Sequence, residues 1–203
     1  MAELINMKQQ IVIIGGGGSF RTYKEYINYL KHKKLALKEL RITKGWKDNL
    51  DKDLGKNFEV IKLKMPNATS AKYIEWKIIF KKLIPLLKNN VILLGHSLGA
   101  IFLAKYLSEN KFPKKIKATI LVSAPFDDGT VNNFKLPNNL DKFKKQGGKI
   151  FLYHSKDDKV VPSEDLKKYK NKLTTAKIVA FKNRGHFEQS RFYELIKNIK
   201  SLY

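Results

Sequence analysis

Residues 91–100 read VILLGHSLGA, in which four apolar residues come before the pattern Gly-x-Ser-x-Gly. The apolar run predicts a buried strand, and the helical spacing of apolar residues after Ser97 predicts a helix. Gly95 and Gly99 allow the strand and the helix to approach closely, so that Ser97 is held in a strained turn with its hydroxyl exposed. The Leu98 amide and the positive end of the helix then face the place where an oxyanion would form. This stretch therefore predicts a nucleophilic serine at position 97.

Short apolar runs alternate with amphipathic stretches along the rest of the chain. Several runs are nearly continuous in Ile, Val and Leu, which is typical of parallel strands that are covered on both faces. The alternation predicts an α/β fold of the three-layer sandwich type, with right-handed crossovers, helices on both sides of a mostly parallel sheet of about six strands, and no large cap domain. The expected strands are 10–14, 58–64, 91–94, 118–123, 149–154 and 177–181.

Helical patterns lie between these runs. The clearest one begins near Tyr73 and should kink or end at Pro85, because proline lacks the backbone donor that a helix interior needs. Other helices are expected over 97–109, 163–173 with Ser163 as the N-cap, and 192–199, while the weaker periodicity of 31–53 admits a short helix over 46–54. Residues 125–140 are expected to be irregular. No internal repeat or flexible linker divides the 203 residues, so we expect a single domain over 1–203.

A nucleophilic serine needs a base and an orienting acid, and two later strand ends offer them in the order Ser, Asp, His. Strand 149–154 runs into Asp158, and strand 177–181 runs into His186. Because the carboxyl ends of parallel strands meet at one edge of a sheet, both side chains can converge on Ser97. The sequence therefore favours Asp158 as the acid and His186 as the base.

Other residues compete for these roles. Asp157 is an alternative acid or a neighbour that caps the loop, and Asp127 and Asp128 follow the strand expected over 118–123. Among the histidines, His96 should turn away from an exposed Ser97 and pack in the interior. His154 is expected to be a structural neighbour of the acid, and His32, which lies among lysines, is expected at the surface.

Three signatures of this chain resemble those of the α/β-hydrolase superfamily over nearly its whole length: Gly-His-Ser-Leu-Gly at 95–99, Asp158-x-x-Val161-Pro162, and Gly185-His186-Phe187. The small size, with Met-Pro-Asn at 65–67 and Tyr-x-Glu-Trp at 73–76, is similar to the compact serine hydrolases of the retinoblastoma-binding protein 9 type. The resemblance implies Ser97 as nucleophile, Asp158 as acid and His186 as base, without a cofactor.

The resemblance also implies that the loop after the first strand supplies a second oxyanion amide beside that of Leu98. Gly15 stands where relatives often have histidine, which leaves Gly17 as the first choice for this donor and Gly16 as the second. The expected reaction is hydrolysis of small carboxylic esters or thioesters through an acyl-enzyme, with a small acyl compound as the partner. Since the chain has little length for a cap, we expect a shallow pocket that favours short acyl chains. Phe20, Phe126 and Phe187 are candidate pocket residues that could equally belong to the core.

The chain is strongly basic, with 41 Lys and Arg against 18 Asp and Glu and a net charge of +23. Nearly all of this charge is lysine, which lacks the planar fork that arginine uses for bases and phosphates, and it is spread along the whole chain. The pattern favours a lysine-rich solvated surface, so no specific nucleic-acid partner is expected. A basic protein that binds a polyanion and a non-catalytic hydrolase scaffold that binds other proteins remain the alternative functions.

Several classes are disfavoured by what the sequence lacks. It has no cysteine, which excludes disulfides, thiolate metal sites and a cysteine nucleophile, and no spacing of His, Asp and Glu suggests a metal site. The glycines at 15–18 do not continue into a dinucleotide or phosphate-loop motif. No apolar run is long enough to span a membrane, and the first ten residues do not form a signal peptide. We therefore expect a cytoplasmic monomer or small homo-oligomer.

Overall fold

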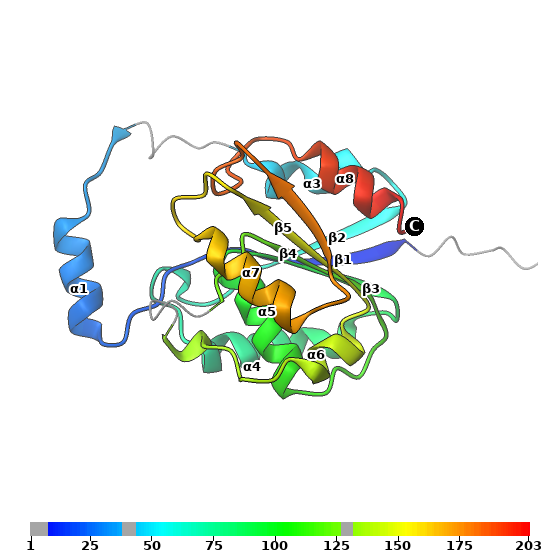
Figure 1. The fold of residues 1–203 in the computed structure, drawn as a ribbon, viewed down its shortest axis with the longest axis horizontal. Helices are drawn as coiled ribbons and strands as arrows, with labels where there is room; N and C mark the ends of the chain where they lie inside the picture. Colours follow the sequence, from blue (N-terminus) through cyan, green and yellow to red (C-terminus); the bar gives the residue numbers. More distant parts are fainter. Residues whose placement is uncertain (1–7, 38–43, 127–131) are drawn as a thin grey trace, which may run out of the picture.

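The computed structural model describes residues 8–37, 44–126 and 132–203, and within them six parallel strands form one sheet between two layers of helices (Figure 1). The strand order is β2-β1-β3-β4-β5-β6, with every neighbouring pair parallel. The α/β sandwich and the six predicted strands are confirmed, with ends shifted by two residues or fewer. The strands are β1 Gln9–Ile14, β2 Phe58–Leu63, β3 Val91–His96, β4 Ile116–Val122, β5 Lys149–Ser155 and β6 Lys177–Phe181.

The α-helices between the strands largely follow the predicted pattern. The helix that begins at Tyr73 ends at Leu83, and Pro85 lies in a tighter 3-10 turn directly after it. Ser163 is the first residue of its helix and Pro162 is the N-cap, so the predicted cap was one residue too late. The α-helices are α1 Tyr23–His32, α3 Trp46–Leu54, α4 Tyr73–Leu83, α5 Leu98–Glu109, α6 Asp141–Gln146, α7 Ser163–Lys172 and α8 Tyr193–Lys200.

The hydrophobic core lies on both faces of the sheet. Along β1, Ile11 and Ile13 face the side covered by α3 and α8, whereas Val12 and Ile14 face the side covered by α4, α5, α6 and α7. Successive side chains of a strand point to opposite faces, so a strand that is covered twice must be apolar throughout. This explains why the central strands are continuous in Ile, Val and Leu, and because all neighbouring strands are parallel, their carboxyl ends lie at one edge of the sheet.

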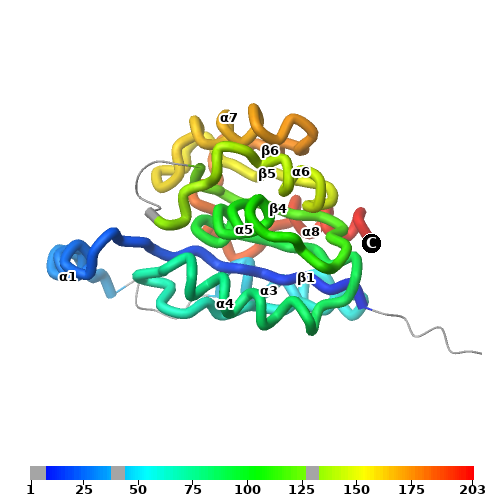
Figure 2. Tube along the Cα trace, turned by 90° about the horizontal axis from the view of Figure 1, so that it is seen from below, coloured from blue at the N-terminus to red at the C-terminus, as the bar shows by residue number. Residues whose placement is uncertain are grey.

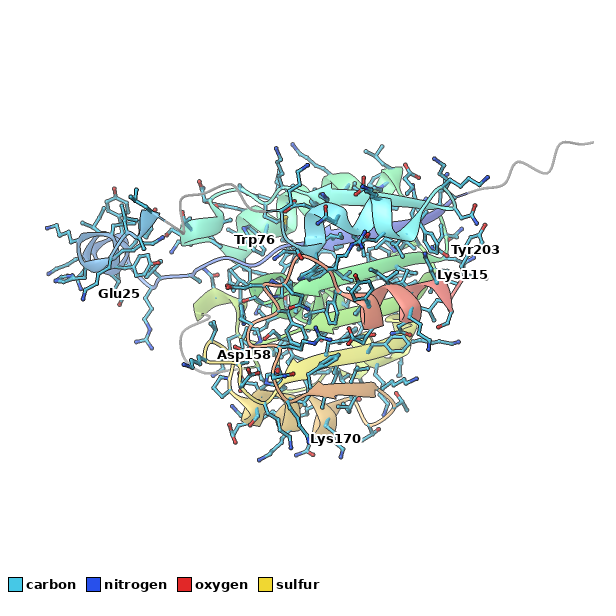
Figure 3. The ribbon with its side chains drawn as sticks, turned by 90° about the horizontal axis from the view of Figure 1, so that it is seen from above. Glu25, Trp76, Lys115, Asp158, Lys170 and Tyr203 are labelled. Carbon is cyan, nitrogen blue, oxygen red and sulfur yellow. The ribbon has the colours of Figure 1, made fainter. Side chains whose placement is uncertain are left out.

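Helix α1 is the exception to this layered arrangement. It stands beyond the carboxyl ends of the strands, away from the sandwich, in both views of the backbone (Figures 1 and 2). None of its residues is buried. In Figure 3, Glu25 of α1 and the labelled residues Lys115 and Tyr203 lie at opposite ends of the molecule, with Asp158 between them. This helix was not predicted, although its apolar residues recur at helical spacing; none of them is buried in the core.

The described residues show neither a membrane-spanning helix nor a cluster of metal ligands. In the part of the chain that the structure describes, no helix has both the length and the apolar character that crossing a bilayer requires. Across residues 8–37, 44–126 and 132–203, no three His, Asp or Glu side chains gather closely enough to hold a metal ion.

Candidate active site

Ser97 occupies the sharp turn between β3 and α5. Its backbone has φ 54° and ψ −123°, a conformation that non-glycine residues rarely adopt, and its amide donates to the carbonyl oxygen of Val122 at 2.9 Å. A Cβ placed on Gly99 would lie 2.3 Å from the Ile14 carbonyl oxygen, and one on Gly95 would lie 2.5 Å from the Cα of Ala100. Only glycine fits at these two positions, so the predicted reason for the motif is confirmed.

Asp158 and His186 meet at the same edge of the sheet. The Nδ1 atom of His186 lies 3.0 and 3.1 Å from the two carboxylate oxygens of Asp158, and the Asp158 side chain is fully shielded from solvent. Burial by itself raises the pKa of Asp158, but hydrogen bonds from His186, Ser123 and the amides of Val160 and Val161 outweigh it and lower this pKa well below its usual range. A carboxylate only accepts, so Nδ1 carries the proton and Nε2 of the neutral ring is left free to act as a base.

Ser123 is a site residue that the sequence did not reveal. It directly follows β4, is fully buried, and has φ 47°. Its hydroxyl donates to Asp158 Oδ2 and lies 3.2 Å from His186 Nδ1. Strand β4 lies between β3 and β5, so its end reaches the residues that follow both neighbours. From the sequence alone, a serine that follows a buried strand cannot be assigned to the site, because its contact with Asp158 and His186 depends on the order of the strands.

The loop that carries His186 is braced from helix α3 and from the end of β3. The Trp46 indole donates to the Phe187 carbonyl oxygen at 2.8 Å, and His96 Nε2 donates to the His186 carbonyl oxygen at 2.9 Å. Phe187 has φ 57°, so this loop, like Ser97 and Ser123, holds a non-glycine residue at positive φ. His96 is therefore buried as predicted, but it also holds the backbone of the proposed base.

Lys47 in turn holds His96, the residue that contacts the His186 backbone. Its Nζ donates to His96 Nδ1 at 3.1 Å, which fixes the neutral tautomer whose Nε2 carries hydrogen. Burial lowers the pKa of Lys47, while Asp48 and Glu188 partly oppose the shift. Burial, and secondarily the nearby Lys47 and His186, lower the pKa of His96 to about 3. His96 thus stays uncharged beside the proposed base over the whole neutral range.

The remaining candidates for acid and base have other surroundings. Asp157 accepts from the Ser155 hydroxyl at 2.5 Å and from the Gly185 amide at 2.9 Å, so it ties the two loops together. His154 is buried at the end of β5, where burial lowers its pKa, and His32 is exposed on α1. The two alternative acids Asp127 and Asp128 lie outside the described residues.

A cavity of about 230 Å³ opens on Ser97 and Leu98, and Gly17 and Gly18 form part of its wall. Gly16 lies against Ser97, whereas Gly17 lies against Ala68 and the Leu98 side chain. A Cβ on Gly16 would come within 3.0 Å of the Ser97 Cβ, whereas one on Gly17 would lie 2.3 Å from the Ala68 carbonyl oxygen. Glycine at 16 therefore lets the loop backbone approach the nucleophile, as an oxyanion loop requires, and glycine at 17 lets the same loop pack against the turn at Ala68.

The three candidate pocket phenylalanines have different positions. Phe20 lines the cavity beside Ser97. Phe126 packs edge-to-face on Tyr169 and its amide donates to Asp165, while its neighbour Pro125 lines the cavity. Phe187 was wrongly expected in the pocket: it is fully buried and stacks on Phe192 in the core under α3 and α8. The backbone turn at Phe187 points its ring inward while the preceding residue reaches Asp158.

The chain is similar in sequence to known serine hydrolases. A family model described as serine hydrolase matches residues 41–202. Serine hydrolase RBBP9 of Rattus norvegicus is 30% identical over 168 residues, which cover 79% of this chain and 87% of that protein. The chain belongs to the serine hydrolase family. The resemblance to compact hydrolases of the retinoblastoma-binding protein 9 type is thus confirmed.

Two solved structures share the fold of this serine hydrolase. The ydeN gene product of B. subtilis has a TM-score of 0.71 at 20% identity, covering 96% of this chain and 98% of its own. The Pyrococcus furiosus esterase Pf2001 has a TM-score of 0.58 at 14% identity, covering 97% of this chain and 82% of its own. These likenesses establish the α/β-hydrolase fold and no more.

Proposed function

We propose that this serine hydrolase cleaves small carboxylic esters or thioesters through Ser97, His186 and Asp158. The observation that carries the proposal is the pairing of His186 with Asp158 at the edge where the strained turn places Ser97 against a cavity. Hydrolase order and strand-end position had pointed to the same three residues, and family membership supports a hydrolase.

The proposed reaction has two halves. His186 Nε2 takes the proton from the Ser97 hydroxyl while its oxygen attacks the acyl carbon, and the proton then passes to the leaving alcohol or thiol as the bond to it breaks. The amides of Leu98 and of Gly17, or in its place Gly16, hold the oxyanion of the tetrahedral intermediate. Water repeats the sequence on the acyl-enzyme and releases the acid. Asp158 keeps Nδ1 protonated and stabilises the imidazolium that forms in each half.

A fluorophosphonate probe tests the nucleophile directly. The wild-type protein should form a covalent adduct detected by intact mass, and Ser97→Ala should form none. Ser108→Ala is the matched control, because Ser108 lies on the same helix and its hydroxyl donates to the Ala104 carbonyl oxygen at 2.7 Å, one turn earlier, so this variant should label as the wild type does. Equal labelling of Ser97→Ala and the wild type would exclude Ser97 as the nucleophile.

Hydrolysis of p-nitrophenyl acetate tests the acid. Asp158→Asn should lower kcat by about four orders of magnitude, because an amide favours the wrong tautomer of the base. Asp157→Asn is the matched neighbour, and since it bonds to the Gly185 amide rather than to His186, it should lose far less. A similar decrease in kcat in both variants would show that Asp158 is not the acid of the triad.

A further inference from the structure

Helix α1 turns its apolar side toward the glycine loop without touching the core. Tyr29 and Leu30 are each 44% exposed, although both are apolar and both belong to an ordered helix. Between these residues and the short turn that contains Ala68 and Thr69 lies a trough of about 340 Å³. The trough is therefore walled on one side by α1 and on the other by the sandwich.

The trough continues into the cavity at Ser97. Gly17, Gly18, Phe20 and Tyr29 line both spaces, and the cavity adds Ser97 and Leu98 on its inner side. A group bonded to the acyl carbon at Ser97 can thus extend past the glycine loop into the trough. The continuity with the proposed nucleophile indicates what kind of molecule the trough receives.

Specific contacts hold α1 in place as a wall. The Phe20 ring packs against Tyr26 and Tyr29, with centroids 5.3 and 5.2 Å apart. The Tyr26 hydroxyl lies 3.3 Å from Thr69 Oγ1, and the Lys72 ammonium donates to the Phe20 carbonyl oxygen at 2.8 Å. The aromatic wall is thus held both to Phe20, which follows the glycine loop, and to the facing turn at Thr69, which makes the trough a feature of the folded chain.

We propose that this trough is a subsite for an apolar chain on the substrate, so that the enzyme prefers esters carrying a medium-length alkyl or aryl group over acetate esters. The proposal rests on the proposed esterase function. Tyr29 and Leu30 determine the preference, because their exposed apolar surface is covered only when such a chain lies against it. We expected a shallow pocket from the chain length alone, and that expectation did not include the wall formed by α1. The family match begins at residue 41, after α1, so Tyr29 and Leu30 belong to a segment outside that match, whereas the facing wall at Ala68 and Thr69 lies inside it.

The test compares kcat/KM along two series of esters. One series keeps p-nitrophenol and lengthens the acyl group from acetyl to octanoyl, and the other keeps the acetyl group and lengthens the alcohol. Each fully covered methylene is worth up to about fourfold in kcat/KM, so the wild type should prefer the longest member of one series by at least about tenfold. The series that shows the preference tells whether the acyl or the alcohol chain occupies the trough.

Variants assign the preference to α1. Tyr29→Ala and Leu30→Ser should each lower the ratio of kcat/KM for the long ester to that for acetate by about threefold or more, because each removes covered apolar area. Tyr23→Ala is the matched control: Tyr23 is a tyrosine of the same helix, 74% exposed and absent from the walls of both cavities, so its ratio and its activity should equal those of the wild type.

Two results overturn the inference. One is a wild type that shows no chain-length preference in either series, and the other is a preference that survives in both Tyr29→Ala and Leu30→Ser. Fluorophosphonate labelling of the same preparations distinguishes failure of the subsite proposal from failure of the proposed function. If Ser97 is labelled and acetate is hydrolysed without a chain-length preference, only the subsite is wrong.

Discussion

Ser123 is held at positive φ beside the proposed acid and base, and its hydroxyl is the feature of this residue that bears on chemistry. Ser123→Ala should lower kcat/KM by roughly tenfold to a hundredfold, because a hydrogen bond to a buried carboxylate is worth about 1.5–3 kcal/mol. The pKa of Asp158 should rise at the same time, since one of the bonds that lowers it is lost. The measurement is kcat/KM for p-nitrophenyl acetate as a function of pH.

Ser123→Gly separates the hydroxyl from the backbone. Glycine tolerates the φ of 47° better than alanine does, yet it also lacks the hydroxyl. Equal losses in the two variants would assign the effect to the hydrogen bond, as we expect. Wild-type activity in Ser123→Gly would show that Ser123 matters only for its backbone conformation.

His96 links the site to the stability of the fold at low pH. Its pKa is about 3 in the folded chain and about 6.5 when unfolded, so the unfolded state binds the proton first as the pH falls. Its contribution to the free energy of unfolding is thus complete above pH 6.5 and is lost as the pH falls toward 3, at up to about 1.4 kcal/mol per pH unit. The buried His154, whose pKa is also lowered, adds a loss of the same sign.

Urea unfolding of the wild type between pH 7 and 4.5 should therefore show a stability that rises with pH. The slope of the unfolding free energy against pH reports how many more protons the unfolded state binds than the folded state. His96→Gln should lower this number by up to about one, whatever the substitution does to the stability at neutral pH. His32→Gln is the control, because His32 is exposed on α1, and it should keep the wild-type slope. An unchanged slope in His96→Gln would mean that His96 binds protons equally in both states.

At the scale of elements, the site depends on how closely α5 approaches the end of β1. Gly99→Ala would bring a Cβ within 2.3 Å of the Ile14 carbonyl oxygen and 2.5 Å of the Gly15 carbonyl oxygen. Both are backbone atoms that cannot turn away, so the variant should lose about 1–3 kcal/mol of stability or more. The midpoint of urea unfolding, at an unchanged m value, measures this loss.

Gly15→Ala is the matched control for the same contact. Among the described residues, and apart from its two chain neighbours, a Cβ at this position would meet no heavy atom within 4 Å, so this variant should stay within about 0.5 kcal/mol of the wild type. If both variants unfold at the wild-type midpoint, the two elements can separate freely and the close approach is not needed for the fold.

The elements that could be predicted from the sequence are those that the core requires. Strands such as β3 are buried on both faces and therefore apolar throughout, and α3 was found over the expected residues because Trp46, Leu50 and Leu54 form one buried stripe. Helix α1 carries apolar residues at helical spacing (Tyr23, Tyr26 and Leu30) and was nevertheless missed; it buries none of them, so it has no counterpart in the predicted core. Short α6, which buries only Phe143, was missed for a similar reason.

The same distinction holds for the site. Motifs in single loops named Ser97, Asp158 and His186, and the structure joins the last two by hydrogen bonds. The roles of Ser123 and Lys47 depend on which strand and helix become neighbours, and nothing local in the chain states this. Phe187 was placed in the pocket because it follows His186, whereas its backbone turn buries the ring.

At the scale of the whole molecule, the net charge of +23 surrounds a site whose proposed chemistry needs no basic surface. Such a charge attracts anions over a Debye length of about 30 Å at 0.01 M salt but only about 8 Å at 0.15 M. A p-nitrophenyl ester with a free carboxylate on its acyl chain should therefore lose roughly threefold to tenfold in kcat/KM over this range, and a neutral ester of equal length should lose none.

Two lysine variants decide whether this salt effect belongs to the molecule or to one side chain. Lys33 lines the trough beside α1, whereas Lys200 lies at the end of α8. If the field of the whole molecule steers the anionic ester, Lys33→Gln and Lys200→Gln should each remove a small and similar part of the salt dependence, because each removes one charge among many. If Lys33→Gln alone loses most of the salt dependence, Lys33 contacts the carboxylate of the ester directly. If the wild type responds to salt equally with the charged and the neutral ester, the net charge has no part in catalysis.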